Sequence, residues 1–262
     1  MLRHTPLVLA AAAGALYLRE RRSRIRLARL GAATLETLLD AIDANTPETG
    51  AHVRRVARYA LILAESADMD QREQHGVERV ALFHDIGKID GALADIIDDT
   101  SHLRPGERRA IMTHPRRGAS VLSPLSAFYP ELAEGVLSHH ERWDGKGYPR
   151  HLRGNHIPLS ARIVAIADTF DAVTHSRSYS RARSIQVAKS VISAGRGTQF
   201  DPDLVDLFLS PPVMQSVLAA MREANGPSRP KLRRRAGRAT QGIPDITFRW
   251  RTPDPAPQPS DR

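Results

Sequence analysis

The sequence has 262 residues, of which 41% are hydrophobic and 26% charged, and it contains no cysteine. This length fits one large domain with tails and excludes a large multidomain protein, while the lack of cysteine excludes disulfides, thiolate clusters and a cysteine nucleophile. The formal charge of +9 comes from the ends, because residues 1–30 hold seven Arg and one Glu and residues 226–262 hold nine Lys/Arg and three Asp. The body between them is slightly acidic, so the charge indicates no specific nucleic-acid partner.

The first 30 residues form an apolar and then basic segment. Residues 6–18 read PLVLAAAAGALYL, and five arginines follow between Arg19 and Arg26. A helix of this length spans ~20 Å, against about 30 Å of bilayer hydrocarbon. Because the strong basic flank follows the apolar run, we predict a cytoplasmic protein with a short apolar helix that anchors it to the cytoplasmic face of the inner membrane through residues 6–18. A soluble N-terminus and a cleaved signal peptide are the alternatives.

The body, residues 31–225, carries helix signals and no alternating run long enough for a strand, which predicts an all-α domain. Thr46, Pro47 and Glu48 form a helix start, and that helix runs to about Ser66. Asp70 with Glu73 starts the next one, which ends at Gly87. Further helices are expected over residues 105–122 with a kink or break at Pro115, and over 130–141, 158–176, 184–194 and 202–224, with a loop over 143–158.

The last segment, residues 226–262, is rich in Pro, Gly and Arg and lacks apolar periodicity. Such a composition predicts a disordered basic tail. Its run Arg233 to Arg235 fits a solubilising tail, or alternatively an electrostatic contact with anionic lipid or RNA.

Histidines and carboxylates in the body have the spacing of metal ligands. Glu48 and His52 share one face of a helix, and His84-Asp85 and His139-His140 each follow a helix. Asp168 places a charge in the apolar run IVAIADTF, where burial is costly without a cation or a partner. Taken singly, each has an ordinary explanation, such as a surface histidine or an ion pair of Asp168 with Arg162 or Arg177.

Together these residues form a pattern of motifs. The sequence contains HDIGK from His84, THP ending at Pro115, HHERWDGKGYP from His139, and ADTFDAVTHSRSY from Ala167, preceded by ETGAHVRRV. Over about residues 34–210 it resembles the HD-GYP branch of the HD phosphohydrolase superfamily. The resemblance implies an HD-domain helical bundle with extra C-terminal helices.

The resemblance also implies an activity, namely metal-dependent hydrolysis of the 3′-5′ phosphodiester of cyclic di-GMP to pGpG, with GMP as the alternative final product. It assigns Asp85 as a bridge between metal ions and Lys88 as a residue facing the scissile phosphate. It places Tyr148 and Arg177 against the ligand, while Gly145 and Gly147 are expected to allow positive φ and a close approach of the backbone to the ligand. The metal ligands that it implies are Glu48, His52, His84, Asp85, His114, His139, His140 and Asp168.

The resemblance implies two or three divalent ions. Imidazole and carboxylate ligands without sulfur favour Fe or Mn first, with Zn as the alternative. Two such ions a few ångströms apart lower the pKa of a shared water and stabilise the attacking and leaving oxygens of an in-line displacement, so no protein nucleophile is needed. Glu48 would serve a third ion.

Two other functions fit the same residues. One is hydrolysis of another cyclic dinucleotide or phosphoester, because Ser178 and Ser180 depart from the family pattern near the ligand. The other is a non-hydrolysing cyclic di-GMP receptor or adaptor that docks on GGDEF cyclases through the GYP loop.

Overall fold

The computed structural model describes residues 5–45, 47–88, 105–175 and 182–224. Within these ranges it does not describe the side chains of residues 5–16, 24, 25, 28, 43, 45, 47, 48, 105 and 108. Within those ranges the chain is helical, and its one β-type pairing is an isolated bridge between Arg196 and Phe200. The prediction of an all-α fold is confirmed. In chain order the elements are α1 (Thr5–Asn45), α2 (Pro47–Ser66), α3 (Gln71–Phe83), η1 (Ile86–Lys88), α5 (Pro105–Ile111), α6 (His114–Leu122), η3 (Ser123–Leu125), α7 (Pro130–Ser138), η4 (Gly154–His156), α8 (Leu159–Thr174), α9 (Ile185–Ala194), α10 (Pro202–Leu209) and α11 (Pro211–Ala224).

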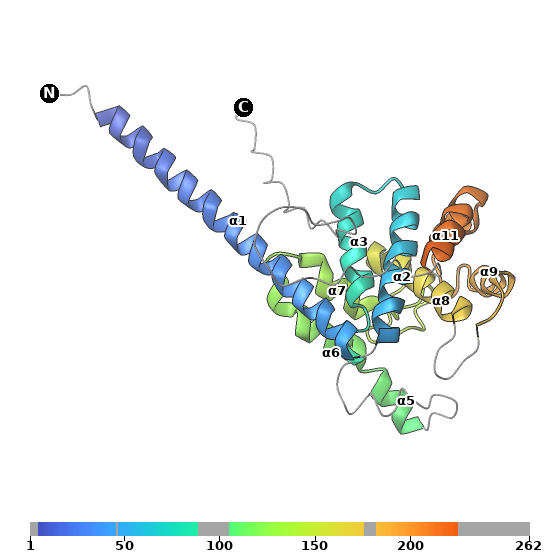
Figure 1. Ribbon diagram of the computed structural model, residues 1–262. Coiled ribbons are helices and arrows are strands. Elements are labelled where there is room, and N and C mark those ends of the chain that lie inside the picture. Colours follow the sequence, from blue (N-terminus) through green and yellow to red (C-terminus); the bar gives the residue numbers. More distant parts are fainter. Residues whose placement is uncertain (1–4, 46, 89–104, 176–181, 225–262) are drawn as a thin grey trace, which may run out of the picture. The chain divides into compact units, whose positions relative to one another are not determined.

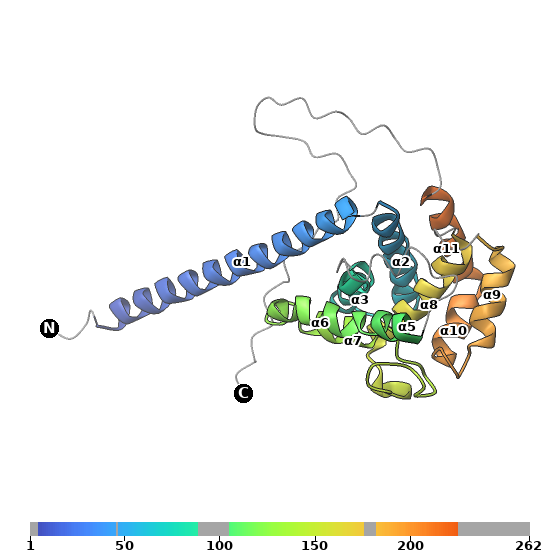
Figure 2. The same cartoon turned by 90° about the horizontal axis from the view of Figure 1, so that it is seen from below.

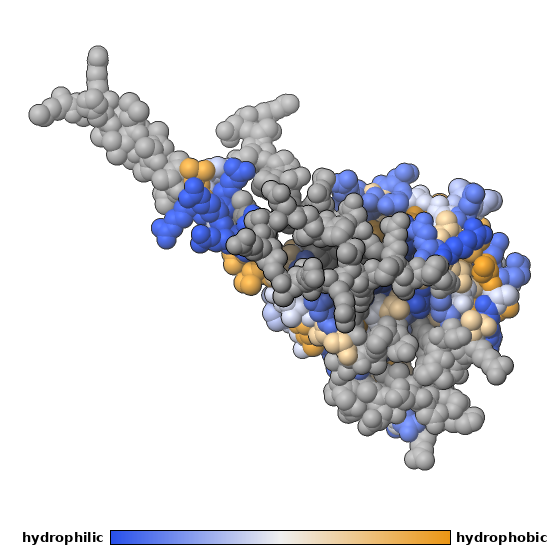
Figure 3. Space-filling view, viewed as in Figure 1, coloured by the Kyte–Doolittle hydropathy of each residue, from blue (hydrophilic) through white to orange (hydrophobic). Residues whose placement is uncertain are grey.

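The described residues divide into two compact units, one within residues 5–38 and the other within residues 39–224. The second unit contains every site residue discussed below. α1 begins in the first unit and ends in the second. It is one continuous helix of 41 residues, much longer than the short apolar helix expected over 6–18. Its middle part is mainly hydrophilic (Figure 3). Exposed apolar side chains lie within and beside its arginine run, such as Leu27 within it and Leu18 and Leu30 at its ends.

Among the described residues, no single helix is both long and apolar enough to cross a bilayer. α10 and α11 taken together have the length and composition of a span, but they are bent by 68° to each other. Many apolar side chains of this pair, among them Val205, Phe208 and Val217, are buried in the bundle. The predicted membrane contact of residues 6–18 involves side chains outside the description and stays a prediction.

The centre of the second unit is formed by α2, α3 and α8, which pack against one another and lie side by side in both ribbon views (Figures 1 and 2). An aromatic chain joins α2 and α8 of this core to α10. The ring centroids of Tyr59 and Phe170 are 5.4 Å apart and those of Phe170 and Phe208 are 5.5 Å apart, both edge to face. Such pairs add ~1 kcal/mol each beyond the apolar area that they bury. The core therefore fixes α2 against α8, the two helices that carry His52 and Asp168.

Local signals account for where most helices start. Asp70 accepts a hydrogen bond from the Glu73 amide while the Glu73 carboxylate accepts one from the Asp70 amide, which is the predicted capping box of α3. The expected helix over 105–122 is broken, as predicted, but between Ile111 and His114 rather than at Pro115. Pro115 instead lies in the first turn of α6, where its missing N–H costs nothing.

Several predicted helix bounds were wrong, and the helix expected to end at Gly87 ends at Phe83. The helix expected over 202–224 is divided because Ser210 is extended, with φ −60° and ψ 147°. Pro211 follows it, and the proline ring disfavours helical backbone in the preceding residue. The helix expected to reach residue 141 ends at Ser138, since His139 and His140 turn away from its axis and toward the site.

Candidate metal centre

Seven of the predicted ligands converge inside the second unit. They come from five places in the bundle: His52 from α2, His84 and Asp85 after the end of α3, His114 from the first residue of α6, His139 and His140 after α7, and Asp168 from α8. The side chain of the eighth, Glu48, lies outside the description, although its backbone belongs to the first turn of α2.

Hydrogen bonds donated by Nδ1 orient four of the imidazoles. The Nδ1 of His84, His114 and His139 lies 2.6–2.7 Å from the carbonyl oxygen three residues earlier, that of Ala81, Ile111 and Val136 respectively. The fourth, His52, has Nδ1 2.7 Å from Asp171 Oδ2. A carbonyl oxygen only accepts, so each of the first three rings carries its proton on Nδ1 and presents a bare Nε2 lone pair to the site.

Asp85 lies between two groups of imidazoles. Its Oδ1 is 3.4 Å from His114 Nε2 and 4.0 Å from His139 Nε2, whereas its Oδ2 is 3.5 Å from His84 Nε2 and 2.7 Å from Lys88 Nζ. Burial alone would raise the pKa of Asp85, but Lys88 and the surrounding imidazoles outweigh it and hold the pKa well below its usual range. The carboxylate is therefore ionised at neutral pH and has one oxygen directed to each group.

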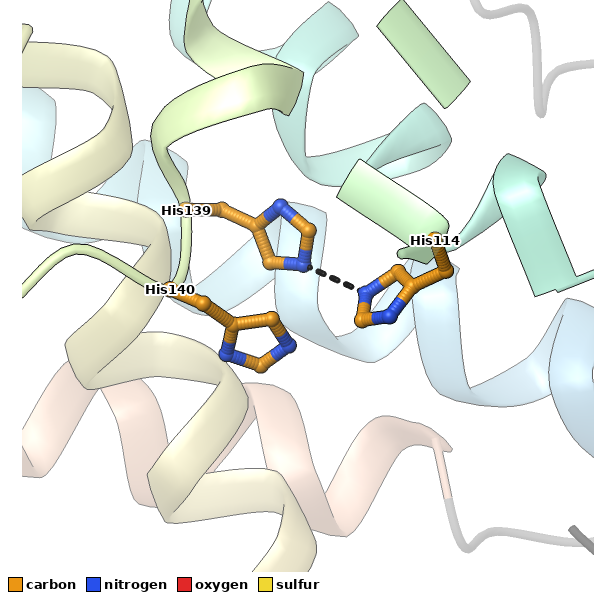
Figure 4. Close-up of side chains that lie close together, drawn as sticks. All are labelled: His114, His139 and His140. Atoms are coloured by element: carbon orange, nitrogen blue, oxygen red, sulfur yellow. Dashed lines mark hydrogen bonds between the residues drawn. The ribbon is translucent and has the colours of Figure 1, made fainter. Parts of the chain in front are cut away.

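The first group consists of His114, His139 and His140, whose ligand atoms lie within 4.8 Å of one another (Figure 4). Burial lowers the pKa of His114 to about 4 and that of His140 to about 3, and it holds the pKa of His139 well below its ordinary value. These rings are neutral at pH 7. Because the Nε2 atoms of His114 and His139 are 3.1 Å apart and both bare, their lone pairs repel unless a cation lies between them.

The second group consists of His52, His84 and Asp85, again within 4.8 Å, with Asp168 beside it. Asp168 Oδ1 is 3.4 Å from His52 Nε2 and 3.9 Å from His84 Nε2. The alternative pairing of Asp168 with Arg162 is wrong for this chain, because Arg162 Nη1 binds Asp201 Oδ2 at 2.6 Å.

These residues fit a pair of divalent cations. His84 Nε2 and Asp85 Oδ1 are buried and have no hydrogen-bond partner, a state that costs about 1–3 kcal/mol per group if nothing compensates it. Imidazole nitrogen and carboxylate oxygen, without sulfur, are ligands for first-row divalent ions. One ion would be held by the His114 group and one by the His52 group, with an oxygen of Asp85 available to each.

The residues predicted to bind substrate lie beside this centre where they are described. Tyr148 stacks on His140, with ring centroids 4.9 Å apart and planes inclined by 26°. Burial, followed by the charges of Asp85 and Asp168, raises the pKa of Tyr148, so the phenol stays protonated and able to donate. Arg177 falls in residues 176–181, outside the described residues.

The two predicted glycines of the loop after His140 have different roles. Gly145 has φ +77°, as expected for a turn that needs the left-handed region. Gly147 does not have positive φ; a Cβ there would come within 2.4 Å of the Arg142 amide nitrogen and 2.5 Å of Glu141 Cα. Gly147 is therefore required for packing of the loop on its own backbone.

The half-buried Trp143 lies under the Arg162 guanidinium. The central carbon of that guanidinium is 5.7 Å from the centroid of the Trp143 ring.

Three structural residues escaped the sequence analysis. Asp171 and Arg55 lie behind His52, and the signal that could have found them is their spacing, three residues beyond Asp168 on α8 and three beyond His52 on α2. Glu141 is buried and accepts hydrogen bonds from the amides of Arg150 and Leu152, which closes the loop that carries Tyr148. Its position inside the HHERWDGKGYP run was the available signal.

Most of the described body matches one known protein family. Residues 36–204 match the family model described as an HD domain, so the chain belongs to the HD domain family. The resemblance to its HD-GYP branch is confirmed by that match together with relatives of this type.

Curated relatives match this region. The chain is 36% identical over 174 residues to the 3′3′-cGAMP-specific phosphodiesterase 2 of Vibrio cholerae, covering 66% of this chain and 33% of the relative. It is 38% identical over 182 residues to the cyclic di-GMP phosphodiesterase response regulator RpfG of Xanthomonas campestris, covering 67% and 47%. The chain thus spans between a third and a half of the length of these relatives.

Solved structures share the fold. A crystal structure of a cyclic GMP-AMP specific phosphodiesterase of V. cholerae has a TM-score of 0.51 and 25% identity, covering 73% of this chain and 51% of that one. The HD domain of the L. monocytogenes phosphodiesterase PgpH in complex with cyclic-di-AMP has a TM-score of 0.51 and 18% identity, covering 73% and 98%. The second likeness, at this identity, concerns the fold alone.

Proposed function

We propose that this chain is a metal-dependent phosphodiesterase that hydrolyses a 3′-5′ cyclic dinucleotide. The observation that carries the proposal is the position of Asp85, whose two carboxylate oxygens face two separate groups of bare imidazole nitrogens. Relatives named as cyclic di-GMP and as 3′3′-cGAMP phosphodiesterases support the substrate class.

The residues in and beside the centre have different roles, which follow from their charge and hydrogen-bonding groups. When bound, the divalent ions supply Lewis acidity and an activated water for an in-line displacement. The neutral imidazoles and the ionised Asp85 hold this centre, and the partly exposed Lys88 ammonium adds a positive charge beside Asp85, suited to the charge that develops on a phosphoryl group. Tyr148, fixed by stacking on His140, supplies a phenol donor and an aromatic edge at the same place.

For the finer features we propose cyclic di-GMP as the first substrate to test, pGpG and then GMP as products, and Fe or Mn as the ions with Zn as the alternative. We also propose docking on GGDEF cyclases through the GYP loop, and attachment to the cytoplasmic face of the membrane through residues 6–18. Each has its own direct test, by pull-down with a purified cyclase domain and by flotation with anionic vesicles.

The activity is tested on the full chain, purified without oxygen and analysed for Fe, Mn and Zn. Cyclic di-GMP, 3′3′-cGAMP and cyclic di-AMP are each followed by chromatography beside Asp85→Asn and the control Asp206→Asn, which removes an exposed carboxylate paired with Arg196. We expect Asp85→Asn to lose ~10³-fold or more in turnover, because ions in such centres contribute several kcal/mol and each 1.36 kcal/mol is tenfold in rate. Asp206→Asn should match the wild type.

Two results would contradict the proposal. Metal without turnover of any of the three dinucleotides would favour a non-hydrolysing receptor, and unchanged turnover in Asp85→Asn would refute the role of the centre.

A further inference from the structure

A second polar cluster lies between α2 and α8, directly behind the proposed metal centre. On α2, Arg55 follows His52 by three residues, and on α8 Asp171 follows Asp168 by the same interval, so each pair lies on one face of its helix. The front pair, His52 and Asp168, faces the centre. The rear pair, Arg55 and Asp171, is joined by hydrogen bonds deep between the two helices.

The Asp171 carboxylate has every acceptor position filled. Oδ2 accepts from His52 Nδ1 at 2.7 Å and from Arg55 Nη2 at 2.9 Å. Oδ1 accepts from Arg55 Nε at 2.7 Å and from His175 Nδ1 at 3.0 Å. The side chain is only 1% exposed, so neither oxygen relies on solvent. Four donors from three residues hold this carboxylate in one orientation.

His175 supports this arrangement from the end of α8. Its Nε2 is buried and has no hydrogen-bond partner, which identifies Nδ1 as the protonated nitrogen that donates to Asp171. Arg55 contributes the charge that a buried carboxylate needs, because an isolated anion at this depth would be strongly destabilising. Among the described contacts, this cluster is linked to the centre through His52.

We propose that Asp171, held by Arg55 and His175, is a positioning residue that fixes His52 with its proton on Nδ1 and its Nε2 directed at the metal ion of the His52 group. A carboxylate on the far nitrogen of a ligating histidine sets its tautomer and orientation and raises its basicity. Asp171 orients His52 by accepting a hydrogen bond from its Nδ1, as main-chain carbonyls do for His84, His114 and His139. It acts on one ion, since it contacts no residue of the His114 group among the described contacts. The inference depends on the metal centre of the proposed function, and not on its substrate.

The test measures metal binding, so it does not depend on turnover. The full chain is stripped with a chelator and titrated with Mn²⁺ alone, and bound ions per chain and their affinities are measured by equilibrium dialysis with elemental analysis. For Asp171→Asn we expect one ion per chain to bind 10–100-fold more weakly, the usual loss for such partners, while the ion of the His114 group is unaffected.

The matched control is Asp201→Asn. Asp201 is also a buried carboxylate held by an arginine, Arg162, but it contacts no predicted ligand. A general effect of losing a buried arginine–carboxylate pair would appear equally in both variants, whereas a positioning role leaves the Mn²⁺ affinities of Asp201→Asn unchanged. Thermal melting of both variants reports the cost in stability separately.

A second variant covers the case in which Asp171→Asn does not fold. Arg55→Lys keeps the positive charge and removes the two-point contact, so we expect a smaller loss, still confined to one ion. Unchanged Mn²⁺ binding in the folded variant, loss of both ions together, or an equal loss in Asp201→Asn would each overturn the inference. Wild-type chain that binds two ions but hydrolyses no dinucleotide would refute the proposed function and leave this inference standing.

Discussion

Three of the site imidazoles each cap the end of a helix. The last four carbonyls of an α-helix have no partner within the helix, and the side chains of His84 and His139 donate to one of them in α3 and α7, respectively. His114 does the same for Ile111, the last residue of α5. One hydrogen bond therefore ends a helix and fixes the direction of a lone pair, which explains why ligands follow helix ends in this sequence.

At the scale of single residues, neutral buried histidines make the stability of the metal-free chain depend on pH. The pKa of His114 falls from 6.5 in the unfolded chain to about 4, and that of His140 to about 3. The unfolded chain therefore binds more protons below pH 6.5, so stability is full above this pH and is lost as pH falls toward 4. For His114 the loss is on the order of 3 kcal/mol, at 1.36 kcal/mol per pKa unit.

Urea unfolding of the chelated chain between pH 7.5 and 4.5 checks this expectation. His114→Gln should flatten the dependence, while His156→Gln, which removes an exposed histidine, should leave it unchanged. Stability that rises on acidification of the metal-free chain would contradict neutral histidines in the site.

The ligand residues could be predicted from the sequence, but the residues that orient them could not. Adjacent His84-Asp85 and His139-His140 are visible as motifs because the chemistry needs those residue types next to one another. Asp171 acts through a partner 119 residues away, and only the packing of α8 on α2 brings it to His52. Periodicity places it on a helix face without identifying what that face meets.

At the scale of elements, helix starts were easier to predict than helix ends. Caps such as Asp70 bind amides only a few residues away, so a helix start can be predicted from the local sequence alone. The end of α7 at Ser138 depends on the loop beyond it. That loop is closed by hydrogen bonds from the amides of Arg150 and Leu152 to the Glu141 carboxylate. That tertiary cause is absent from the local sequence.

The loop after His140 gives a test at this scale. Gly147→Ala would bring a Cβ to 2.4 Å from a backbone nitrogen, and backbone cannot rotate away as a side chain can. We expect a loss of about 1–3 kcal/mol in the free energy of unfolding, as for overpacked sites, together with a displaced Tyr148. Because no ligand is changed, metal content should be retained while turnover falls. Gly106→Ala is the control, since a Cβ there meets nothing within 4 Å, and metal loss in Gly147→Ala would contradict this account.

At the scale of the second unit, the proposed centre joins segments that are remote in sequence. Its ligands come from α2, α6 and α8 and from the residues that follow α3 and α7, and these helices form the body of the bundle (Figure 2). The neutral imidazoles and the ionised Asp85 lie together with lone pairs directed inward, an arrangement that is unfavourable until cations occupy it. Metal binding and the stability of this unit should therefore be strongly linked.

Removing the metal should consequently lower the melting temperature of the whole unit. An ion present at 1,000 times its dissociation constant stabilises the native state by about 4 kcal/mol, and each kcal/mol shifts Tm by ~2–4 °C at this chain length. We expect chelation to lower Tm by roughly 10 °C, and Mn²⁺ to restore it, in thermal melts of the full chain. Asp85→Asn should melt at a temperature that hardly responds to chelator, because both ions lose their shared carboxylate, whereas Asp206→Asn should respond like the wild type. Equal melting of chelated and Mn²⁺-loaded wild-type chain would mean that the imidazoles hold no ion, and the centre would have to be explained by hydrogen bonding alone.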